Sequence, residues 1–547
     1  MLRRLLPIVS LLLIAGASQA DFRLTIIHTN DIHAHLEPTK VKNGTYGGYA
    51  RLATLIEQYK KHEKNPIVLS AGDTFQGTLY FNMYEGLADM ALMNVIGYNA
   101  MSLGNHEFDR GPTTLAAFIK QAQFPVLSAN LDLRAEPELK DLVKPSVVIT
   151  IGKDKVGIIG AVTPDLPTIS SPGPNIKMLD WQTSVQAEVD RLTADGVTKI
   201  LVLSHSGYEF EQEMAKKLRG VDVIVGAHSH TLLGTFTNTD FPQSRGPYPT
   251  MAKDADGNTT LVLQAWEWGK VLGCIQVDFD NKGHVKGWNN TAMRAVDDTV
   301  PDDPTVAALV AAFKKPIEAQ ANAKVGATET GIGREGENLM ACVVADAQLA
   351  ACQKLGAVAA FMNLGGVRSG VDAGPITYGE AIQVQPFNNP MVVVELTGDE
   401  IKRALEWGVH LMPEYSGGTL YVSKGTSYEV QSWMPEGERI VNVVIAGESL
   451  ESAKSYKIAM NGFLAGGGDG HEVIKTAKGA RQDSGILDID AFVDYLKANS
   501  PLNPVAEGRI KVLKKASGLF RQNLDRAGVH VVKSGNDGSL TRIQRAA

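Results

Sequence analysis

The stretch Gly104-Asn105-His106-Glu107-Phe108-Asp109 predicts the fold of this chain, because it directly follows a short apolar run, Ala100 to Leu103, that reads as a buried strand. It places an amide, an imidazole and two carboxylates just after that strand. In layered α/β folds the loops after strand ends converge at one edge of the sheet, and sites form there. We therefore interpret this stretch as one part of a site whose other parts follow other strands.

Four other segments combine a short apolar run with polar side chains in the same way. They are Asn30-Asp31-Ile32-His33 after Phe22 to Ile27, Gly72-Asp73 after Ile67 to Leu69, Ser204-His205-Ser206-Gly207 after Ile200 to Leu203, and Gly226-Ala227-His228-Ser229-His230 after Val221 to Val225. Asp, Asn and His are suitable ligands for a pair of divalent ions, and one carboxylate can bridge two ions about 3.5 to 4 Å apart. The five segments therefore predict a dinuclear metal site.

The expected ligands form two sets that share one carboxylate. Oxygen and nitrogen donors without a thiolate fit Zn, Mn or Co, and ligand type does not decide among these metals. The first set is Asp31, His33, Asp73 and His230, and the second is Asp73, Asn105, His205 and His228. Asp73 is the predicted bridge between the two divalent ions.

Two residues of the opening stretch are candidates for catalysis rather than for metal binding. His106 directly follows the ligand Asn105, so its imidazole can face a substrate, and Asp109 lies three residues on, where it can orient the ring. Water held between two cations becomes a nucleophile near neutral pH, and the cations neutralise charge on a phosphoryl group. His106 would stabilise the transition state or protonate the leaving group. This arrangement suits in-line hydrolysis of a phosphate ester or anhydride.

Length and charge limit the possible architectures and partners. At 547 residues the chain exceeds what one hydrophobic core usually spans, so at least two domains are expected. The formal net charge of −7 argues against a nucleic-acid polymer as partner. Strand and helix signals alternate to about residue 290, a helical run extends from Thr305 through Ala323, and a second α/β region follows. The expected parts are a signal peptide (1–20), a catalytic domain (21–300), a connecting helix (301–325), a substrate-binding domain (326–517) and a polar C-terminal tail (518–547).

The first twenty residues are typical of an export signal. Arg3 and Arg4 precede an apolar run, Leu5 to Ala15, and small residues precede Asp21. The arginine pair also allows a twin-arginine signal. With no second long apolar segment and no hydrophobic tail, we expect a periplasmic or secreted protein without a membrane anchor. The three cysteines are interpreted as buried thiols, a long-range disulfide is left open, and the oligomeric state is not predicted.

The motifs HTNDIHAH, GDTFQGT, GNHEFD, SHSG and GAHSH resemble the metal motifs of the metallophosphatase-type 5′-nucleotidases, which include the periplasmic UDP-sugar hydrolase/5′-nucleotidases. The resemblance covers nearly the whole mature chain. It implies an α/β fold in which a four-layer calcineurin-like metallophosphoesterase domain is joined by a helix to a C-terminal α/β nucleotide-binding domain. It also implies the metal ligands given above and catalytic roles for His106 and Asp109. Some members carry Gln where His230 stands, so this position bears on metal preference.

Four loops of the second half resemble the family's substrate-binding loops: residues 331–334, 363–368, 385–389 and 461–470. By themselves, Gly-rich runs are usually turns and Phe residues are usually core, so the resemblance carries this assignment. Guanidinium groups suit phosphate oxygens, and each aromatic ring stacked on a base contributes about 1 to 3 kcal/mol. The resemblance assigns phosphate binding to Arg334 and Arg368, base stacking to Phe387 and Phe463, and sugar or base contacts to Asn363, Asn389 and Asp469.

The main expectation is therefore a secreted two-metal hydrolase of nucleoside 5′-monophosphates, with UDP-sugars or other nucleotide diphosphates as further candidate substrates. One alternative is a 2′,3′-cyclic-nucleotide phosphodiesterase/3′-nucleotidase, which the sequence does not separate from the main expectation. A dimetal thiosulfohydrolase is disfavoured by the Phe387 and Phe463 pair, and a non-catalytic nucleotide-binding surface protein by the complete ligand set. Because metal and base contacts lie in different halves, we expect an interdomain site and hypothesise that the second domain swings to carry the nucleotide.

Overall fold

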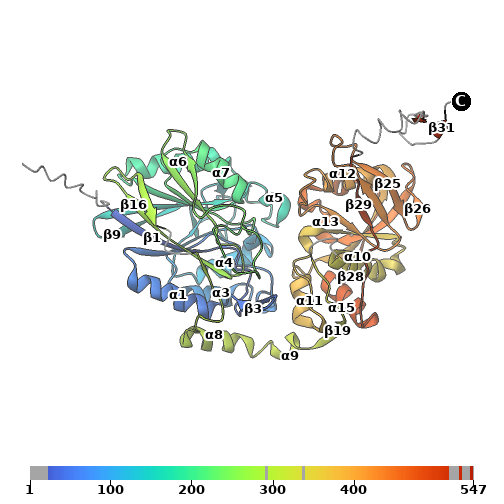
Figure 1. Ribbon diagram of the computed structural model, residues 1–547, viewed down its shortest axis with the longest axis horizontal. Coiled ribbons are helices and arrows are strands. Elements are labelled where there is room, and N and C mark those ends of the chain that lie inside the picture. The colour runs from blue at the N-terminus through green and yellow to red at the C-terminus, as the bar shows by residue number, and fades with distance from the viewer. Residues whose placement is uncertain (1–21, 290–292, 335–338, 516–528, 532–542, 546–547) are drawn as a thin grey trace, which may run out of the picture. The chain divides into compact units, whose positions relative to one another are not determined.

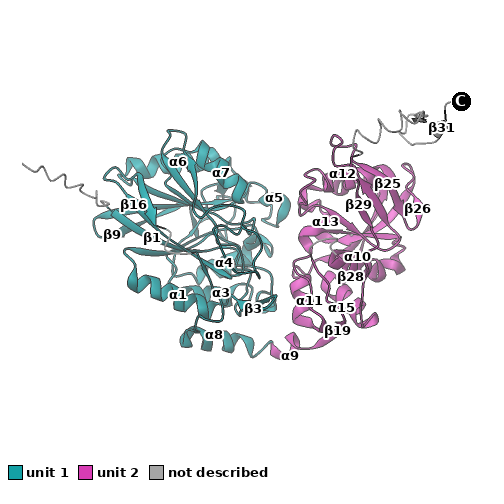
Figure 2. Cartoon of the chain, viewed as in Figure 1, with its two compact units in different colours: residues 1–317 teal, residues 318–547 magenta. Residues whose placement is uncertain are grey.

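The computed structural model describes residues 22–289, 293–334, 339–515, 529–531 and 543–545 (Figure 1). The chain divides into two compact units, residues 1–317 and 318–547 (Figure 2). The division falls inside the segment 301–325 that was expected to connect two domains. The expected signal peptide, residues 1–20, lies outside the described residues. Within the described segments, no helix has the length and apolar character needed to cross a membrane.

Unit 1 contains two large mixed sheets. The first has the order β17 (Val285–Asn289), β16 (Val271–Phe279), β1 (Phe22–Thr29), β4 (Pro66–Ser70), β5 (Ala100–Ser102), β6 (Val126–Leu127) and β8 (Val143–Lys144), with β18 (Arg294–Ala295) paired to β16. The second has the order β14 (Thr250–Lys253), β15 (Thr259–Leu263), β13 (Val223–Val225), β12 (Lys199–His205), β10 (Asp154–Val162) and β9 (Ser146–Ile151). Strands β1, β4 and β5 are parallel neighbours in the first sheet, and β12 and β13 in the second.

Helices cover the outer faces of the two sheets, which gives four layers. Helices α1 (Tyr49–His62) and α3 (Leu87–Ile96) lie on the side of the first sheet, and α6 (Trp181–Ala194) and α7 (Tyr208–Lys217) lie on the side of the second (Figure 1). The apolar strands are buried on both faces, as parallel strands in such folds usually are. The core between the sheets includes Ile26, Ile67, Leu127, Ile158 and Leu203, all at most 1% exposed. The four-layer α/β arrangement predicted from the sequence is present in unit 1.

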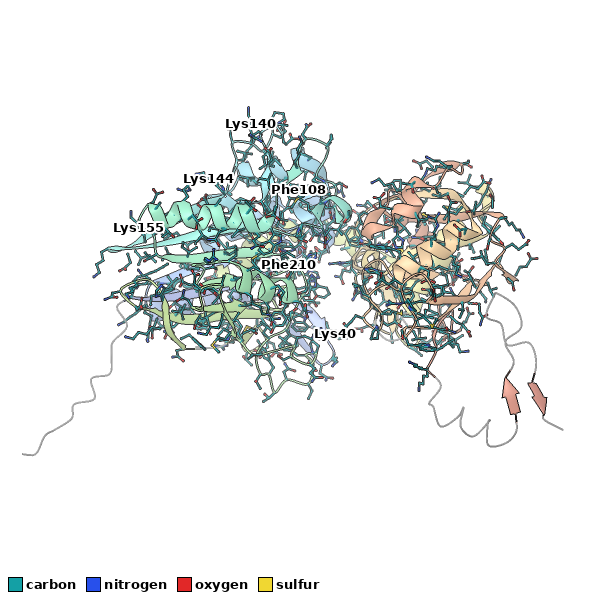
Figure 3. The ribbon with its side chains drawn as sticks, turned by 90° about the horizontal axis from the view of Figure 1, so that it is seen from above. Lys40, Phe108, Lys140, Lys144, Lys155 and Phe210 are labelled. Carbon is teal, nitrogen blue, oxygen red and sulfur yellow. The ribbon has the colours of Figure 1, made fainter. Side chains whose placement is uncertain are left out.

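Shorter elements complete unit 1. They are β2 (Thr39–Val41), β3 (Gly44–Tyr46), α2 (Leu79–Tyr84), η1 (His106–Phe108), α4 (Gly111–Lys120), β7 (Leu131–Asp132), α5 (Leu166–Ile169) and β11 (Lys177–Met178). Phe108, the last residue of η1, is labelled in Figure 3 and is fully buried. Burial of this ring favours the observed position of the stretch that carries Asn105 and His106.

The connection between the units consists of two helices rather than one run from Thr305 through Ala323. Helix α8 (Pro304–Lys314) ends just before Pro316, and α9 (Glu318–Ala321) begins after it. Lys315 still has helical backbone, with φ of −51° and ψ of −43°, but Pro316 lacks the backbone N–H that the next helical hydrogen bond needs. This missing donor explains the interruption. Helix α8 packs within unit 1, where Tyr84 Oη donates to the Phe313 carbonyl at 2.8 Å.

Unit 2 is built on a mixed sheet with the order β23 (Leu420–Val422), β20 (Ala359–Asn363), β27 (Ser455–Asn461), β22 (Pro390–Thr397) and β28 (Arg481–Leu487). A smaller sheet contains β26 (Glu448–Ser449), β25 (Ile440–Ile445), β24 (Ser427–Val430) and β29 (Ile510–Val512), and β19 (Lys324–Thr328) pairs with β21 (Gly374–Thr377). The helical elements are α10 (Leu339–Cys352), η2 (Gln353–Leu355), η3 (Leu364–Gly366), α11 (Tyr378–Val384), α12 (Gly398–Gly408), α13 (Gly462–Ala465), η4 (Gly468–Gly470), α14 (Glu472–Thr476) and α15 (Asp488–Ala498).

A separate core holds unit 2 together. It joins α12 to both sheets through Phe361, Ile401, Leu405, Tyr428 and Ile458, none more than 1% exposed. Helix α12 forms there because apolar residues line one face and Thr397 with Glu400 makes a capping box at its start. The unit has the mixed α/β character predicted from the sequence.

The C-terminal tail and the cysteines complete the description. Strands β30 (Val529–Val531) and β31 (Ile543–Arg545) pair antiparallel within the segment expected to be a polar tail. All three cysteines lie in described segments, and none forms a disulfide. Cys274 and Cys352 are buried as expected, whereas Cys342 is only half-buried.

Candidate functional site

The seven residues predicted as metal ligands lie at the carboxyl ends of five strands in unit 1. Because β1, β4 and β5 are adjacent and parallel, as are β12 and β13, their following loops meet at one edge. Asp31 and His33 follow β1, Asp73 follows β4, Asn105 follows β5, His205 ends β12, and His228 and His230 follow β13.

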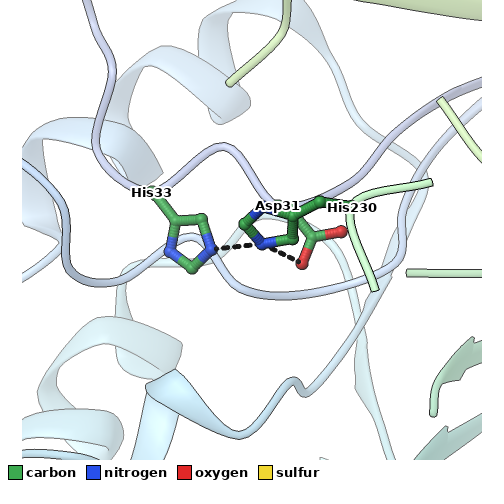
Figure 4. A group of neighbouring side chains, drawn as sticks. All are labelled: Asp31, His33 and His230. Carbon is green, nitrogen blue, oxygen red and sulfur yellow. Dashed lines mark hydrogen bonds and ion pairs between the residues drawn. The ribbon is translucent and has the colours of Figure 1, made fainter. Parts of the chain in front are cut away.

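Asp31, His33 and His230 form the first group of donors (Figure 4). The Nε2 atoms of His33 and His230 lie 3.1 Å apart, and His230 Nε2 lies 3.4 Å from Asp31 Oδ1. Two imidazole nitrogens at this separation require a proton or a cation between them, because two lone pairs repel each other. The group therefore provides three converging ligand atoms.

Asp73, His205 and His228 form the second group. His205 Nε2 lies 3.0 Å from Asp73 Oδ2, and His228 Nδ1 lies 2.9 Å from Asn105 Oδ1. The same Asp73 oxygen also lies 3.8 Å from His33 Nε2 in the first group. Asp73 thus lies between the two groups, which is the position that a bridging carboxylate requires.

The outward ring nitrogens of three histidines have hydrogen-bond partners that orient the rings. Such contacts hold Nε2 towards the centre and select the tautomer, as is usual for histidines that bind metals. The partners are the Phe75 carbonyl oxygen, 2.8 Å from His33 Nδ1, the Ala71 carbonyl oxygen, 2.7 Å from His205 Nδ1, and Glu267 Oε2, 2.5 Å from His230 Nδ1.

The backbone that carries the donors is strained. Asp31, His33, Asp73, His228 and His230 all have φ between 49° and 76°. This left-handed region costs a non-glycine residue about 1 to 3 kcal/mol and is enriched at functional sites. Five strained residues converging at one point indicate a site whose geometry is selected for binding rather than for stability.

Close backbone approach restricts the same loops. Gly72 has φ of +89°, and a Cβ there would lie 2.5 Å from the backbone nitrogen of Gly104. Only glycine combines this conformation with this contact. Gly72 therefore allows the β4 and β5 loops to bring Asp73 and Asn105 together.

The electrostatics of the centre favour positive charge. Burial would raise the pKa of Asp73, but the imidazoles of His205, His106 and His33 lower this pKa well below its usual range. Burial would lower the pKa of His205, but Asp73 and Asp31 raise it to about 10. Burial and the charge of His205 instead lower the pKa of His228 to about 3. The carboxylates thus draw positive charge into the centre, and the donor set fits a pair of divalent cations.

His106 forms a third group of neighbouring donor atoms with His33 and Asp73, and it also contacts Asp109. His106 Nδ1 lies 2.6 Å from Asp109 Oδ2, and His106 Nε2 lies 4.0 Å from Asp73 Oδ2. Asp109 is held in turn by Gln76 Nε2 at 2.9 Å and by the Ser170 hydroxyl at 2.6 Å. The arrangement leaves Nε2 of His106 as the ring atom directed towards the centre.

Sequence reasoning missed two carboxylates that organise these loops, the buried Glu107 and the half-buried Glu267. Glu107 accepts hydrogen bonds from the backbone N–H groups of Gly104 at 2.7 Å, Asp73 at 3.0 Å and Thr74 at 2.6 Å. Burial and the charge of Asp73 raise its pKa to about 7. Glu267 contacts His230, as described above. Two features of the sequence could have indicated these roles. Glu107 lies inside the stretch 104–109, and Glu267 lies between two tryptophans at 266 and 268.

In unit 2, the sheet brings most of the predicted nucleotide contacts to one edge. Strand β20 ends at Asn363 and the parallel β27 ends at Asn461, while the antiparallel β22 begins beside Asn461. Six predicted residues lie at these ends, namely Asn363 at the end of β20, Arg368 after it, Phe387 and Asn389 before β22, and Phe463 and Asp469 after β27.

Several of these residues contact one another. Asn363 Nδ2 donates to Asp469 Oδ2 at 2.7 Å, and Asn461 Nδ2 donates to Asn363 Oδ1 at 2.9 Å. The Arg368 guanidinium lies 5.9 Å from the centre of the Phe387 ring. Asp469 has φ of 54°, so this carboxylate is also held in a strained loop.

Two of the predicted residues, Arg334 and Asn389, make hydrogen bonds to other residues of the protein. Arg334 Nε donates to the Val367 carbonyl at 2.6 Å, which places it beside the loop that carries Arg368. Asn389 Nδ2 donates to Asp488 Oδ2 at 3.1 Å. Phe387 and Phe463 are half-buried rather than core residues. Their partial exposure is compatible with stacking on a ligand.

Comparison with known proteins finds a matching family model for each unit. Residues 24–232 match the family model for calcineurin-like phosphoesterases, and residues 319–476 match the model for the 5′-nucleotidase C-terminal domain. The crystal structure of a 5′-nucleotidase precursor from Thermus thermophilus has a TM-score of 0.86 and 42% sequence identity, covering 90% of this chain and all of that one. The snake venom 5′-nucleotidase of Gloydius brevicauda is 34% identical over 95% of each chain.

A third relative is a larger protein. The trifunctional nucleotide phosphoesterase protein YfkN of Bacillus subtilis (strain 168) is 34% identical over 89% of this chain. The matched region is 35% of YfkN, so this chain spans about a third of that relative.

Proposed function

This chain belongs to the 5′-nucleotidase family of metal-dependent phosphoester hydrolases, and from this premise we propose that it hydrolyses nucleoside 5′-monophosphates at the centre around Asp73. The family and the enzyme class predicted from the sequence are confirmed by the comparisons. The observation that carries the proposal is the convergence of two donor groups on one Asp73 oxygen, 3.0 Å from His205 and 3.8 Å from His33.

The proposed ligands hold two divalent ions, of Zn, Mn or Co. When bound, the ions supply a nucleophile from water and neutralise the charge of the phosphoryl group. We assign the first position to Asp31, His33, Asp73 and His230, and the second to Asp73, Asn105, His205 and His228.

His106 acts on the substrate in this proposal. The contact with Asp109 keeps Nδ1 protonated, so Nε2 of the ring faces the phosphoryl group or the departing 5′-oxygen. A protonated Nε2 stabilises the oxygen on which negative charge grows and gives it a proton as the ester bond breaks. Asp109 is a positioning residue, held by Gln76 and Ser170.

Nucleotide recognition is assigned to unit 2. All seven proposed binding residues fall inside the region that matches the 5′-nucleotidase C-terminal domain, residues 319–476. We propose that Phe387 and Phe463 stack on the base and that Arg334 and Arg368 bind phosphate oxygens. Asp469 accepts from ribose hydroxyls, with its carboxylate oriented by the 2.7 Å contact from Asn363. Asn363 and Asn389 contact sugar or base.

A broader nucleotide phosphoesterase activity is the second candidate. The observation that favours it is the 34% identity to a relative described as a trifunctional nucleotide phosphoesterase. In this case 2′,3′-cyclic nucleotides and UDP-sugars are hydrolysed at the same centre.

Export from the cytoplasm, suggested by residues 1–20, is proposed as well. It is tested by N-terminal sequencing of the protein recovered from the periplasm or medium.

The test is phosphate release from metal-reconstituted protein with AMP, UMP, UDP-glucose, 2′,3′-cyclic AMP and para-nitrophenyl phosphate, with and without a chelator. UDP-glucose and the cyclic nucleotide are assayed with and without an auxiliary phosphatase, because their first cleavage does not release inorganic phosphate. Chelator-sensitive preference for nucleoside monophosphates over the nitrophenyl ester supports the main proposal. Cleavage of the cyclic nucleotide or UDP-glucose at a comparable rate favours the second candidate. Equal, weak hydrolysis of all five contradicts the proposed base clamp.

A further inference from the structure

The loop from Trp266 to Lys270, between β15 and β16, carries strain that the core does not explain. Trp266 has φ of 58° and Trp268 has φ of 55°. A bulky residue in the left-handed region is a clear outlier and costs about 1 to 3 kcal/mol. Two such tryptophans within three residues indicate that the position of this loop matters for function.

The loop is tied to the segment that carries the candidate ligand Asp31. The backbone nitrogen of Trp268 donates to the Asp31 carbonyl at 2.7 Å, and Asn30 Nδ2 donates to the Trp266 carbonyl at 2.6 Å. The Ala265 nitrogen donates to Asn30 Oδ1 at 2.8 Å. These three hydrogen bonds fix the loop against one edge of the proposed metal centre.

Glu267 connects this loop to His230. Its Oε2 atom lies 2.5 Å from His230 Nδ1, and its Oε1 atom lies 2.6 Å from Lys270 Nζ. Lys270 has only 3% of its side chain exposed. Its ammonium lies 3.9 Å from the centre of the Trp266 ring and 4.0 Å from that of Trp268. Burial lowers the pKa of Lys270, and the Glu267 carboxylate opposes this shift. The two indole faces add a favourable contact to the cation.

His230 needs such a partner more than His33 and His205 do. The side chain of His230 is 22% exposed, against 2% for His33 and 0% for His205, so packing restrains it less. The Nδ1 atoms of His33 and His205 face backbone carbonyls, whereas that of His230 faces a carboxylate. A carboxylate partner orients the ring and makes its other nitrogen a stronger donor to a metal.

We propose that Glu267 is a positioning residue that sets the affinity of the first metal position through His230, and that Lys270, held between Trp266 and Trp268, fixes Glu267. This inference rests on the proposed function, because it requires a divalent ion at Asp31, His33 and His230. Glu267 touches neither substrate nor metal in this role. It acts only through the orientation and donor strength of the His230 ring.

The experiment measures the number of bound metal ions per chain at buffered free Zn²⁺ or Mn²⁺ concentrations. Glu267→Gln is expected to weaken one of the two binding equivalents by about 10- to 100-fold and to leave the other unchanged. The matched control is Glu188→Gln, which removes another poorly exposed carboxylate of unit 1, bound to Arg191 at 2.7 Å. The control is expected to bind both ions as the wild type does. Melting curves recorded in chelator verify that each variant folds.

The His230→Ala background separates positioning from a general effect on the fold. Alanine leaves no ring for Glu267 to orient, so adding Glu267→Gln there is expected to change metal affinity by less than about threefold. An equal loss in both backgrounds, or no loss in the wild-type background, overturns the inference. A wild-type chain that binds no divalent ion overturns the proposed metal centre itself, and this result appears before any substitution is made.

Discussion

At the scale of single residues, the contact of 2.6 Å between His106 Nδ1 and Asp109 Oδ2 defines which ring nitrogen can act on a substrate. His106→Ala removes the group that stabilises and protonates the leaving oxygen, so we expect kcat to fall by about 10²- to 10⁴-fold. Nucleotide affinity, measured by calorimetry, should stay within a few fold of the wild type. His284→Ala is the control, because His284 is half exposed at 51%. Wild-type turnover of His106→Ala would refute the assigned role.

The half-buried rings of Phe387 and Phe463 allow a second prediction at this scale. Each stacking contact contributes about 1 to 3 kcal/mol, so Phe463→Ala should raise KM for AMP by roughly 5- to 150-fold. Hydrolysis of para-nitrophenyl phosphate has no base to stack and should change little. A variant in which both substrates are affected equally would indicate damage to the fold rather than loss of a base contact.

The donor residues could be predicted from the sequence because each one adjoins an apolar run. Asp31, Asp73 and His205 lie at the ends of strands whose positions in the sequence are marked by apolar runs. Glu107 and Glu267 could not be assigned in this way, because their roles depend on contacts that only the folded chain creates. Nothing local to the sequence shows that a glutamate is buried or that a neighbouring tryptophan has positive φ.

At the scale of elements, Asp488 at the start of α15 is buried, with 2% exposed. Burial raises its pKa to about 7, although the Asn389 amide opposes this shift. The unfolded chain releases the proton near pH 4, whereas the folded chain holds it up to about pH 7. The free energy of unfolding therefore falls as pH rises from 4 to 7, and the loss persists above pH 7.

Asp488→Asn removes the ionisable group, so we expect the variant to gain several degrees in Tm relative to the wild type at pH 8 and little at pH 4. Thermal melting followed by circular dichroism at both pH values measures the difference. Asp494→Asn, at an exposed position of the same helix, is the control. A gain of the same size at pH 4 and pH 8 would contradict the explanation by ionisation.

Elements that contain an apolar run were predictable, including the three-residue strands β5 and β13, and the two-residue strands were not. Strands β1, β4 and β12 agree with their apolar runs to within two residues, and α1 continues three residues beyond the expected Tyr59. The break between α8 and α9 was missed, although Pro316 signals it. Strands β6, β7 and β8 have two residues each, too few to show a periodic pattern. Tertiary pairing alone determines them.

At the scale of the whole molecule, the order of the motifs along the chain was sufficient to predict two α/β parts. The motifs predicted to bind metal all precede residue 231, and the loops predicted to bind nucleotide all follow residue 330. The boundary between the units at residue 317 lay inside the expected connection, but the sequence did not specify it because the helical composition continues across Pro316. Contacts such as that of Tyr84 with Phe313 determine that α8 packs within unit 1.

Each unit has a hydrophobic core of its own, so ligands that bind different units should stabilise different unfolding transitions. A ligand that binds only the folded form adds about 2.7 kcal/mol at 100 times its Kd. We expect calorimetry to show that divalent metal raises the transition of unit 1 and adenosine that of unit 2. Asp73→Asn should abolish the response to metal and keep the response to adenosine. A single transition that both ligands raise together would mean that the two cores unfold as one cooperative structure, which would contradict the assignment of metal and base to separately stable units.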